Sequence, residues 1–132
     1  MPNYFRVIQV KSIKNQALIA DKCFVADSFF QRLKGLMGRR DLKQGEGLLI
    51  SPCRDIHMWF MRIPIDVVFI KKLQNPPKEL SGSLYQVTGV RESLRPWRLF
   101  PVWCRKATDT LELPVGTIQR CGIQAGDPLC LS

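Results

Sequence analysis

The chain has 132 residues, a length typical of one domain, and 45% of them are hydrophobic, enough to bury a core without disulfide staples. Its formal net charge is +9, and because Lys and Arg are spread along the chain, this excess indicates solubility and weak attraction to polyanions rather than a dedicated binding arm. No apolar run reaches about 18 residues, the length that spans a bilayer, and no pattern of a secretory leader is visible, so we expect one soluble domain over residues 1–132, in the cytoplasm.

Short segments rich in β-branched and apolar residues run through most of the chain, each bounded by Gly, Pro, Asn, Asp or Ser. In order they are 6–10, 17–26, 47–50, 56–61, 65–70, 84–90, 99–104, 109–113 and 128–131. The long helical runs that connect parallel strands are missing between them. We therefore predict a mostly β fold, either a small barrel or a jelly-roll-like sandwich.

Two short helices are expected to interrupt this pattern. The first is predicted over 28–37, where a serine and a glutamine have the spacing of a capping box and apolar residues recur at helical intervals. Gly38 would end it. The second is predicted near 116–122, and the hydrophilic segment 71–83 is predicted to be a long loop.

The sequence IHMWFMRIPIDVVFI, residues 56–70, is the most apolar run and contains the only histidine, His57. Because Pro64 cannot donate to a sheet ladder, the "RIP" tripeptide is predicted to bend the chain between two strands. Alternation along the first strand predicts two faces, one with Ile56, Met58 and Phe60 and the other with His57, Trp59 and Met61.

Asp66 follows this bend among apolar neighbours, and burying an unpaired carboxylate is costly. The nearest partners in sequence are Arg62, His57 and the backbone amides of the bend. The simpler interpretation is structural, with Asp66 accepting from those amides and His57 bonding to a backbone carbonyl. The alternative is an enzyme in which His57 and Asp66 form an acid–base pair, the carboxylate fixing the tautomer of the histidine.

Five stretches occur together in the chain, GLMGRRDL (35–42), GEGLLI (45–50), IHMWFMRIPIDVVFI (56–70), LELPVG (111–116) and GIQAGD (122–127). In this combination the chain resembles, over about 25–131, the domain-of-unknown-function family 192, small bacterial and archaeal proteins without an established activity. The resemblance implies a compact, mostly β barrel or sandwich with one or two short helices. It implies no catalytic residue. Where many relatives read Phe-Trp-Met-Lys-Asn-Thr, this chain has WFMRI, so Arg62 takes the place of the lysine.

The five cysteines are widely spaced and form no C-x-x-C motif, which favours free thiols over a disulfide framework or a zinc ribbon. One cluster of soft side chains is of the kind that copper(I) prefers: Cys53, His57, Met58 and Met61. Because a second cysteine pair is missing, we interpret them as core and loop residues. No metal and no cofactor are expected.

The segment 91–106 interleaves basic and aromatic residues, an arrangement found in proteins that bind single-stranded nucleic acid. The residues concerned are Arg91, Arg95, Trp97, Arg98, Trp103 and Arg105. Two prolines break the segment, so its basic side chains need not share a face. We favour a solvated strand edge or a partner contact over nucleic-acid binding.

A last polar residue, Glu112, lies between two leucines on a predicted strand, which directs it to the opposite face. We expect it to pair with Arg62 or another basic residue across the sheet.

The pattern as a whole favours a non-catalytic binding or accessory module for a small molecule or a protein. Methionine and tryptophan side chains beside one arginine and one aspartate would form a small apolar cleft with a few orienting polar groups. The predicted lining residues are Leu36, Met37, His57, Trp59, Met61, Arg62 and Asp66.

Overall fold

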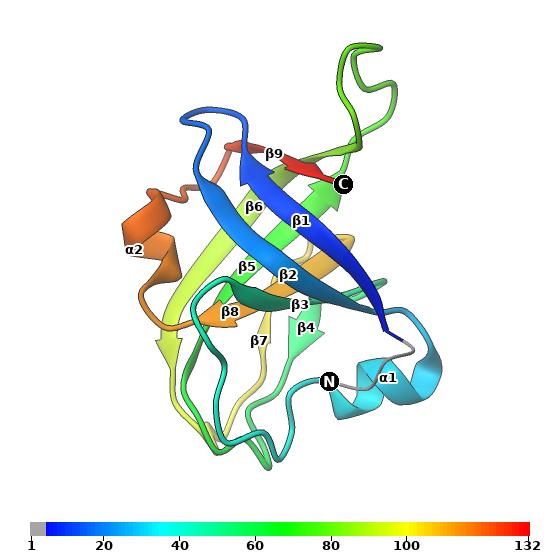
Figure 1. The fold of residues 1–132 in the computed structure, drawn as a ribbon. Helices are drawn as coiled ribbons and strands as arrows, with labels where there is room; N and C mark the ends of the chain where they lie inside the picture. The colour runs from blue at the N-terminus through cyan, green and yellow to red at the C-terminus, as the bar shows by residue number, and fades with distance from the viewer. Residues whose placement is uncertain (1–4) are drawn as a thin grey trace.

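The computed structural model describes residues 5–132; residues 1–4 of the predicted domain lie outside the described part. Its main strands are β1 (Arg6–Ser12), β2 (Leu18–Ala26), β3 (Glu46–Ile50), β5 (Ile65–Lys72), β6 (Ser83–Leu94), β8 (Asp109–Pro114) and β9 (Pro128–Leu131). They close a barrel in the order β1-β2-β3-β8-β5-β6-β9, with β2 and β3 parallel and the other pairs antiparallel (Figure 1). The mostly β prediction is confirmed, and the architecture is a barrel rather than a sandwich. Among residues 5–132, no helix has the length and apolar character needed to cross a bilayer.

Two of the predicted strands, 56–61 and 99–104, are mostly irregular chain. Only β4 (Asp55–Ile56) and β7 (Val102–Trp103) are extended there, and they pair with each other in a small separate sheet. Residues 57–64 form turns and irregular backbone between β4 and β5. The prediction of a strand over 56–61 is therefore wrong beyond its first residue.

The alternation predicted for that segment fails for the same reason. Met58 and Met61 are both buried, whereas Trp59 and Phe60 between them are exposed. A turn explains this, because the amide of Met61 donates to the carbonyl of Met58 at 3.3 Å and Phe60 adopts a φ of 65°. Turn geometry sends the two central side chains outward together.

The first helix, α1 (Phe29–Lys34), is shorter than predicted. Its capping box is present, with Ser28 as the N-cap, but Gly35 (φ 50°) ends the helix rather than Gly38. None of its residues is buried. The second helix, α2 (Thr117–Cys121), ends at Gly122 as predicted and packs side chains into the interior of the barrel.

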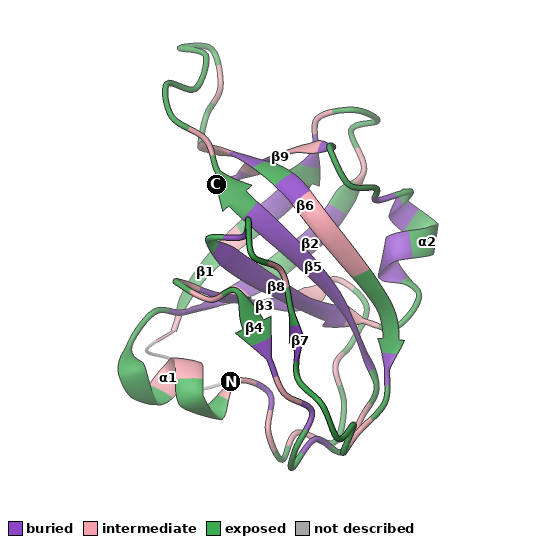
Figure 2. Ribbon diagram, turned by 180° about the vertical axis from the view of Figure 1, so that it is seen from behind, coloured by how far each residue is buried: buried purple, intermediate pink, exposed green. Residues whose placement is uncertain are grey.

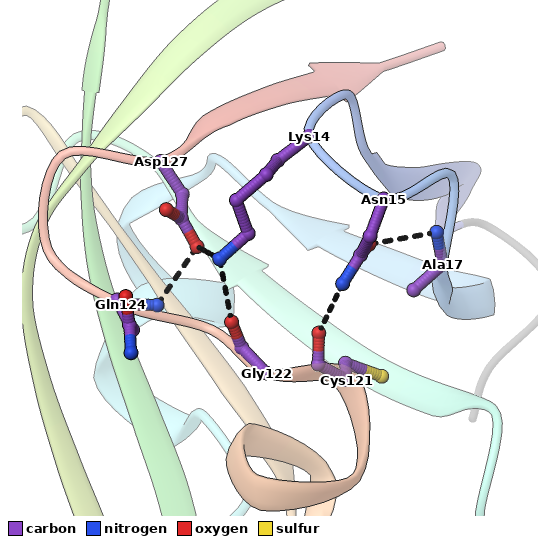
Figure 3. Close-up of polar contacts among 7 residues, drawn as sticks. All are labelled: Lys14, Asn15, Ala17, Cys121, Gly122, Gln124 and Asp127. Carbon is purple, nitrogen blue, oxygen red and sulfur yellow. Dashed lines mark hydrogen bonds and ion pairs between the residues drawn. The ribbon is translucent and has the colours of Figure 1, made fainter.

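The end of the barrel next to α2 is tied to the β1–β2 turn (Figure 3). The ammonium of Lys14 donates to Asp127 at 2.9 Å and to the carbonyl of Gly122 at 3.0 Å, while Asn15 donates to the carbonyl of Cys121 at 3.0 Å. These bonds fix the loop that leads into β9, the strand that closes the barrel between β1 and β6.

The central strands β3, β5 and β8 are buried on both faces (Figure 2). Residues such as Leu49, Val68 and Leu111 point into the barrel, and alternate residues such as Leu48 and Phe69 point outward into a second apolar cluster. That second cluster is covered by three segments, residues 29–42, 51–64 and 95–108, which we call the cap. The cap creates a second layer on the outside of the barrel.

Candidate functional site

Asp66 is fully buried at the start of β5, and its partners are backbone amides from distant parts of the chain. Oδ1 accepts from the amide of Ser93 at 2.9 Å, and Oδ2 accepts from the amides of Gly116 and Ile118 at 3.1 and 3.0 Å. The carboxylate thus joins the end of β6 to the beginning of α2.

The partners predicted for Asp66 are therefore wrong. Across residues 5–132, no hydrogen bond or ion pair joins it to His57 or Arg62, and the amides that it binds belong to other segments than the bend. Sequence proximity misled here because the barrel brings β6 and α2 to the start of β5. The acid–base pair of the enzyme alternative is not assembled.

A cavity of about 70 Å³ lies between the cap and the outer face of the barrel. Glu112 of β8 lies at its barrel wall, and the other lining residues are 32–37, Ile50, Cys53, Asp55, Ile56, His57 and Met61. Four of the predicted cleft residues meet here: Leu36, Met37, His57 and Met61. Their role in binding a ligand stays a prediction.

Glu112 is the most unusual group in this cavity. Its side chain is on the outer face of β8, in register with Leu48 and Val67, and the residue is only 4% exposed. Within the described part of the chain it forms no hydrogen bond or ion pair, so the predicted pairing with Arg62 is wrong. Burial, which penalises the charged form, raises the pKa of Glu112 to about 7.

Gly35 allows the end of α1 to approach this carboxyl group. A Cβ at that position would lie 3.3 Å from Oε1 of Glu112, and the φ of 50° also disfavours a side chain. The residue that ends α1 therefore lies close to the glutamate, with no room for a side chain between them.

Two further polar atoms at the cavity are buried and lack a partner among residues 5–132: Nδ1 of His57 and Nε of Arg32. The imidazole stacks on Trp59, with ring centroids 5.0 Å apart. Such unpaired groups are rare in folded proteins and require an explanation. Both atoms belong to residues that line the cavity together with Glu112.

Cys53 contributes a thiol to the same cavity. Its Sγ donates to the carbonyl of Asp55 at 2.9 Å, and burial raises the pKa of the thiol. All five cysteines are free. In the described part of the chain, no group of three or more His, Cys, Asp or Glu side chains is arranged to hold a metal ion.

An open groove of about 560 Å³ adjoins the cavity. The two share Lys34, Met37 and Met61, and the groove is completed by Gly38, Phe60, Arg62 and Trp97. Arg62 therefore lies near the predicted site, whereas Trp59 and Asp66 line neither space. Glu112 is the main residue whose place sequence reasoning missed; a single carboxylate in a strand covered on both faces was the available signal.

The basic and aromatic residues of 91–106 do not form one continuous element. Arg91 lies on β6, Trp103 on β7, and Trp97 in the connection between them, and all three are exposed. A nucleic-acid role for this set stays a prediction.

Comparison with known proteins places these features in a family. The sequence matches DUF192, described as "Uncharacterized ACR, COG1430", over residues 10–131, a match that begins earlier than the predicted residue 25. A UPF0127 protein of Thermococcus sibiricus is 31% identical over 109 residues, which are 80% of this chain and 62% of that protein. The chain thus spans less than two thirds of the length of this relative.

Two solved structures share the fold. A protein of unknown function from Novosphingobium aromaticivorans has a TM-score of 0.75 and 21% identity, covering 98% of this chain and 89% of that one. A proposed transcription regulator from Sinorhizobium meliloti has a TM-score of 0.72 and 23% identity, covering 99% and 96%. The sequence match over residues 10–131 leads to one conclusion: the chain belongs to the DUF192 family.

Proposed function

We propose that the protein is a non-catalytic binding module whose ligand places a hydrogen-bond donor beside Glu112 and an apolar portion in the adjoining groove. The observation that supports this most is the buried carboxyl of Glu112, which faces the cavity without a partner among the described residues. A buried polar group gains most from a ligand that supplies its missing hydrogen bond.

The size of the cavity limits what can enter it. A volume of about 70 Å³ accommodates a small polar group, since about 10–15 Å³ of such space is enough to hold one water. An ammonium or amide head group fits this space and offers donors to the Glu112 carboxyl. The groove, at about 560 Å³, is in the range of small-molecule sites, and its methionine and aromatic lining suits an apolar body.

A fragment screen followed by ¹H–¹⁵N NMR tests this proposal. Primary alkylamines and amides with short apolar tails should shift the amide resonances of Gly35, His57 and Glu112, whereas matched alkyl carboxylates should not. Glu112→Leu should abolish these shifts because the acceptor is gone, while the exposed Glu92→Gln should retain them. Equal shifts in Glu112→Leu and the unsubstituted protein would contradict the proposal.

The amine fragments should also show a defined pH dependence. A cationic head group requires the ionised carboxylate, so its affinity should rise as the pH increases through about 7, the pKa of Glu112. Titrations of one amine and its neutral amide analogue at several pH values measure this difference. A pH-independent amine affinity would exclude Glu112 as the binding group.

A further inference from the structure

A second feature of the cap borders the groove: large apolar side chains project from two adjacent loops, and two of them, Phe60 and Trp97, also line the groove. These loops, residues 58–62 and 95–100, are called the tip. On the tip, Phe60 is 61% exposed, Trp97 60%, Leu99 70% and Phe100 70%. Figure 1 shows the loops between β4 and β5 and between β6 and β7 at one end of the molecule, away from α2 and from the 71–83 loop.

The tip is held in a defined shape. The amide of Trp97 donates to the carbonyl of Met58 at 2.7 Å, and the indole of Trp59 donates to the carbonyl of Leu99 at 3.2 Å. The rings of Phe60 and Trp97 pack with centroids 4.8 Å apart. The fold therefore presents these side chains together rather than leaving them to move independently.

The backbone of the tip is also strained. Phe60 and Trp97 adopt φ values of 65° and 60°, a region that bulky residues rarely occupy and that costs about 1–3 kcal/mol per residue. Burial of the rings does not offset this cost, because both remain mostly exposed. Strain that directs aromatic rings into solvent is characteristic of a binding surface.

The charged residues within the two tip loops have one sign. Arg62, Arg95 and Arg98 are exposed on the same loops, and the surrounding stretches 56–65 and 93–108 contain no Asp or Glu. Across the groove, α1 adds the exposed Phe29, Phe30 and Leu33, together with Lys34. An exposed apolar end flanked by cations is complementary to an apolar interface with negative charge.

We propose that the tip docks on the surface of an anionic phospholipid bilayer. Phe60, Trp97, Leu99 and Phe100 enter the headgroup region, where amphipathic rings and apolar side chains are stable, and the arginines contact lipid phosphates. A bilayer fits better than a nucleic acid because Leu99 offers no stacking surface to a base. The projecting position of the loops allows contact without a clash with the barrel (Figure 1).

Cosedimentation of the full chain with vesicles tests this inference. Mixed phosphatidylcholine–phosphatidylserine vesicles should bind the protein, and pure phosphatidylcholine vesicles should bind it much less. Phe100→Ser should weaken binding about tenfold through lost apolar burial, and Arg95→Ala about fivefold through lost attraction to the anionic surface. Tryptophan fluorescence should shift to the blue on binding.

Matched controls separate a specific tip from general attraction of a basic protein. Val115→Ser and Arg120→Ala remove an exposed apolar group and an exposed cation near or on α2, and should leave vesicle binding unchanged. Glu112→Leu should also leave it unchanged, which separates this inference from the proposed cavity ligand. Equal losses in Arg95→Ala and Arg120→Ala would overturn the proposal, as would tight binding of an oligothymidylate without binding of anionic vesicles.

Discussion

Two buried carboxyl groups on neighbouring strands, Asp66 and Glu112, have opposite surroundings. Asp66 is paired with Leu113 and Glu112 with Val67 in the β5–β8 ladder, so the two side chains lie on opposite faces. Asp66 receives three amide hydrogen bonds, whereas Glu112 receives none among the described residues. The first group stabilises the fold, whereas burial of the second without a hydrogen-bond partner among the described residues costs stability.

Asp66→Asn tests the structural role. The amide keeps the size of the side chain but removes the charge and turns a donor toward a backbone donor, so we expect a loss of about 2–4 kcal/mol of unfolding free energy. Urea denaturation followed by circular dichroism measures it. The exposed Glu92→Gln should change stability by less than about 0.5 kcal/mol, and an equally small effect of Asp66→Asn would show that these hydrogen bonds contribute little.

Glu112 should make stability depend on pH. Its pKa is 4.5 in the absence of burial and about 7 in the fold, so between these values the folded state binds more protons than the unfolded state. The contribution of this group is therefore lost as the pH rises across that window, by about 3 kcal/mol. Glu112→Gln removes this titration. The free energy of unfolding of the variant, relative to that of the unsubstituted protein, should therefore increase as the pH rises. Parallel curves would show that the carboxyl is solvated.

At the scale of elements, α1 shows how a helical pattern can be correct locally and misleading about packing. The capping box forms as the sequence predicts, yet the apolar face of the helix contributes nothing to the core. Only Leu36, in the turn after Gly35, is buried in the second apolar cluster. The helix positions the cavity wall and leaves its rings in solvent.

A pair of substitutions distinguishes the two kinds of apolar residue in this region. Phe30→Ala should change the unfolding free energy by less than about 0.5 kcal/mol, because the ring is exposed. Leu36→Ala, which leaves a cavity in the second apolar cluster, should cost about 2–4 kcal/mol. Thermal and urea denaturation of the two variants measure both. A large loss in Phe30→Ala would mean that α1 packs against the protein in solution.

At the scale of the whole molecule, closure of the barrel depends on its last strand. β9 pairs with both β1 and β6, and its Leu129 and Leu131 fill the interior. The cap covers the outer faces of β3, β5 and β8. These three strands therefore contribute side chains to two apolar clusters, one inside the barrel and one beneath the cap.

Deletion of residues 128–132 should therefore abolish cooperative unfolding. Two buried leucines at about 2–5 kcal/mol each, plus the edges left open on β1 and β6, exceed the usual stability of a domain of this size. Deletion of 76–79, in the loop between β5 and β6, should cost less than about 1 kcal/mol. Circular dichroism and size-exclusion chromatography compare the two; a cooperative transition in the first variant would show that β9 is dispensable.

Much of the barrel could be predicted from local patterns. The segments that became β1, β2, β3, β5, β6, β8 and β9 alternate or are continuously apolar, and glycine ends both helices, because strand and helix preferences act over a few neighbouring residues. The same patterns failed between residues 57 and 64. A turn there directs some of the apolar side chains into the second apolar cluster and others into solvent.

The sequence by itself therefore determined which segments form the strands of the barrel and where α2 lies. Only the tertiary structure decided that Asp66 is bound by amides 27, 50 and 52 residues away, that Glu112 lies beneath the cap, and that α1 and the tip expose their rings. The reason is physical: local preferences depend on adjacent residues, whereas the partner of a buried charge and the exposure of an apolar face depend on which distant strands the closed barrel brings beside them.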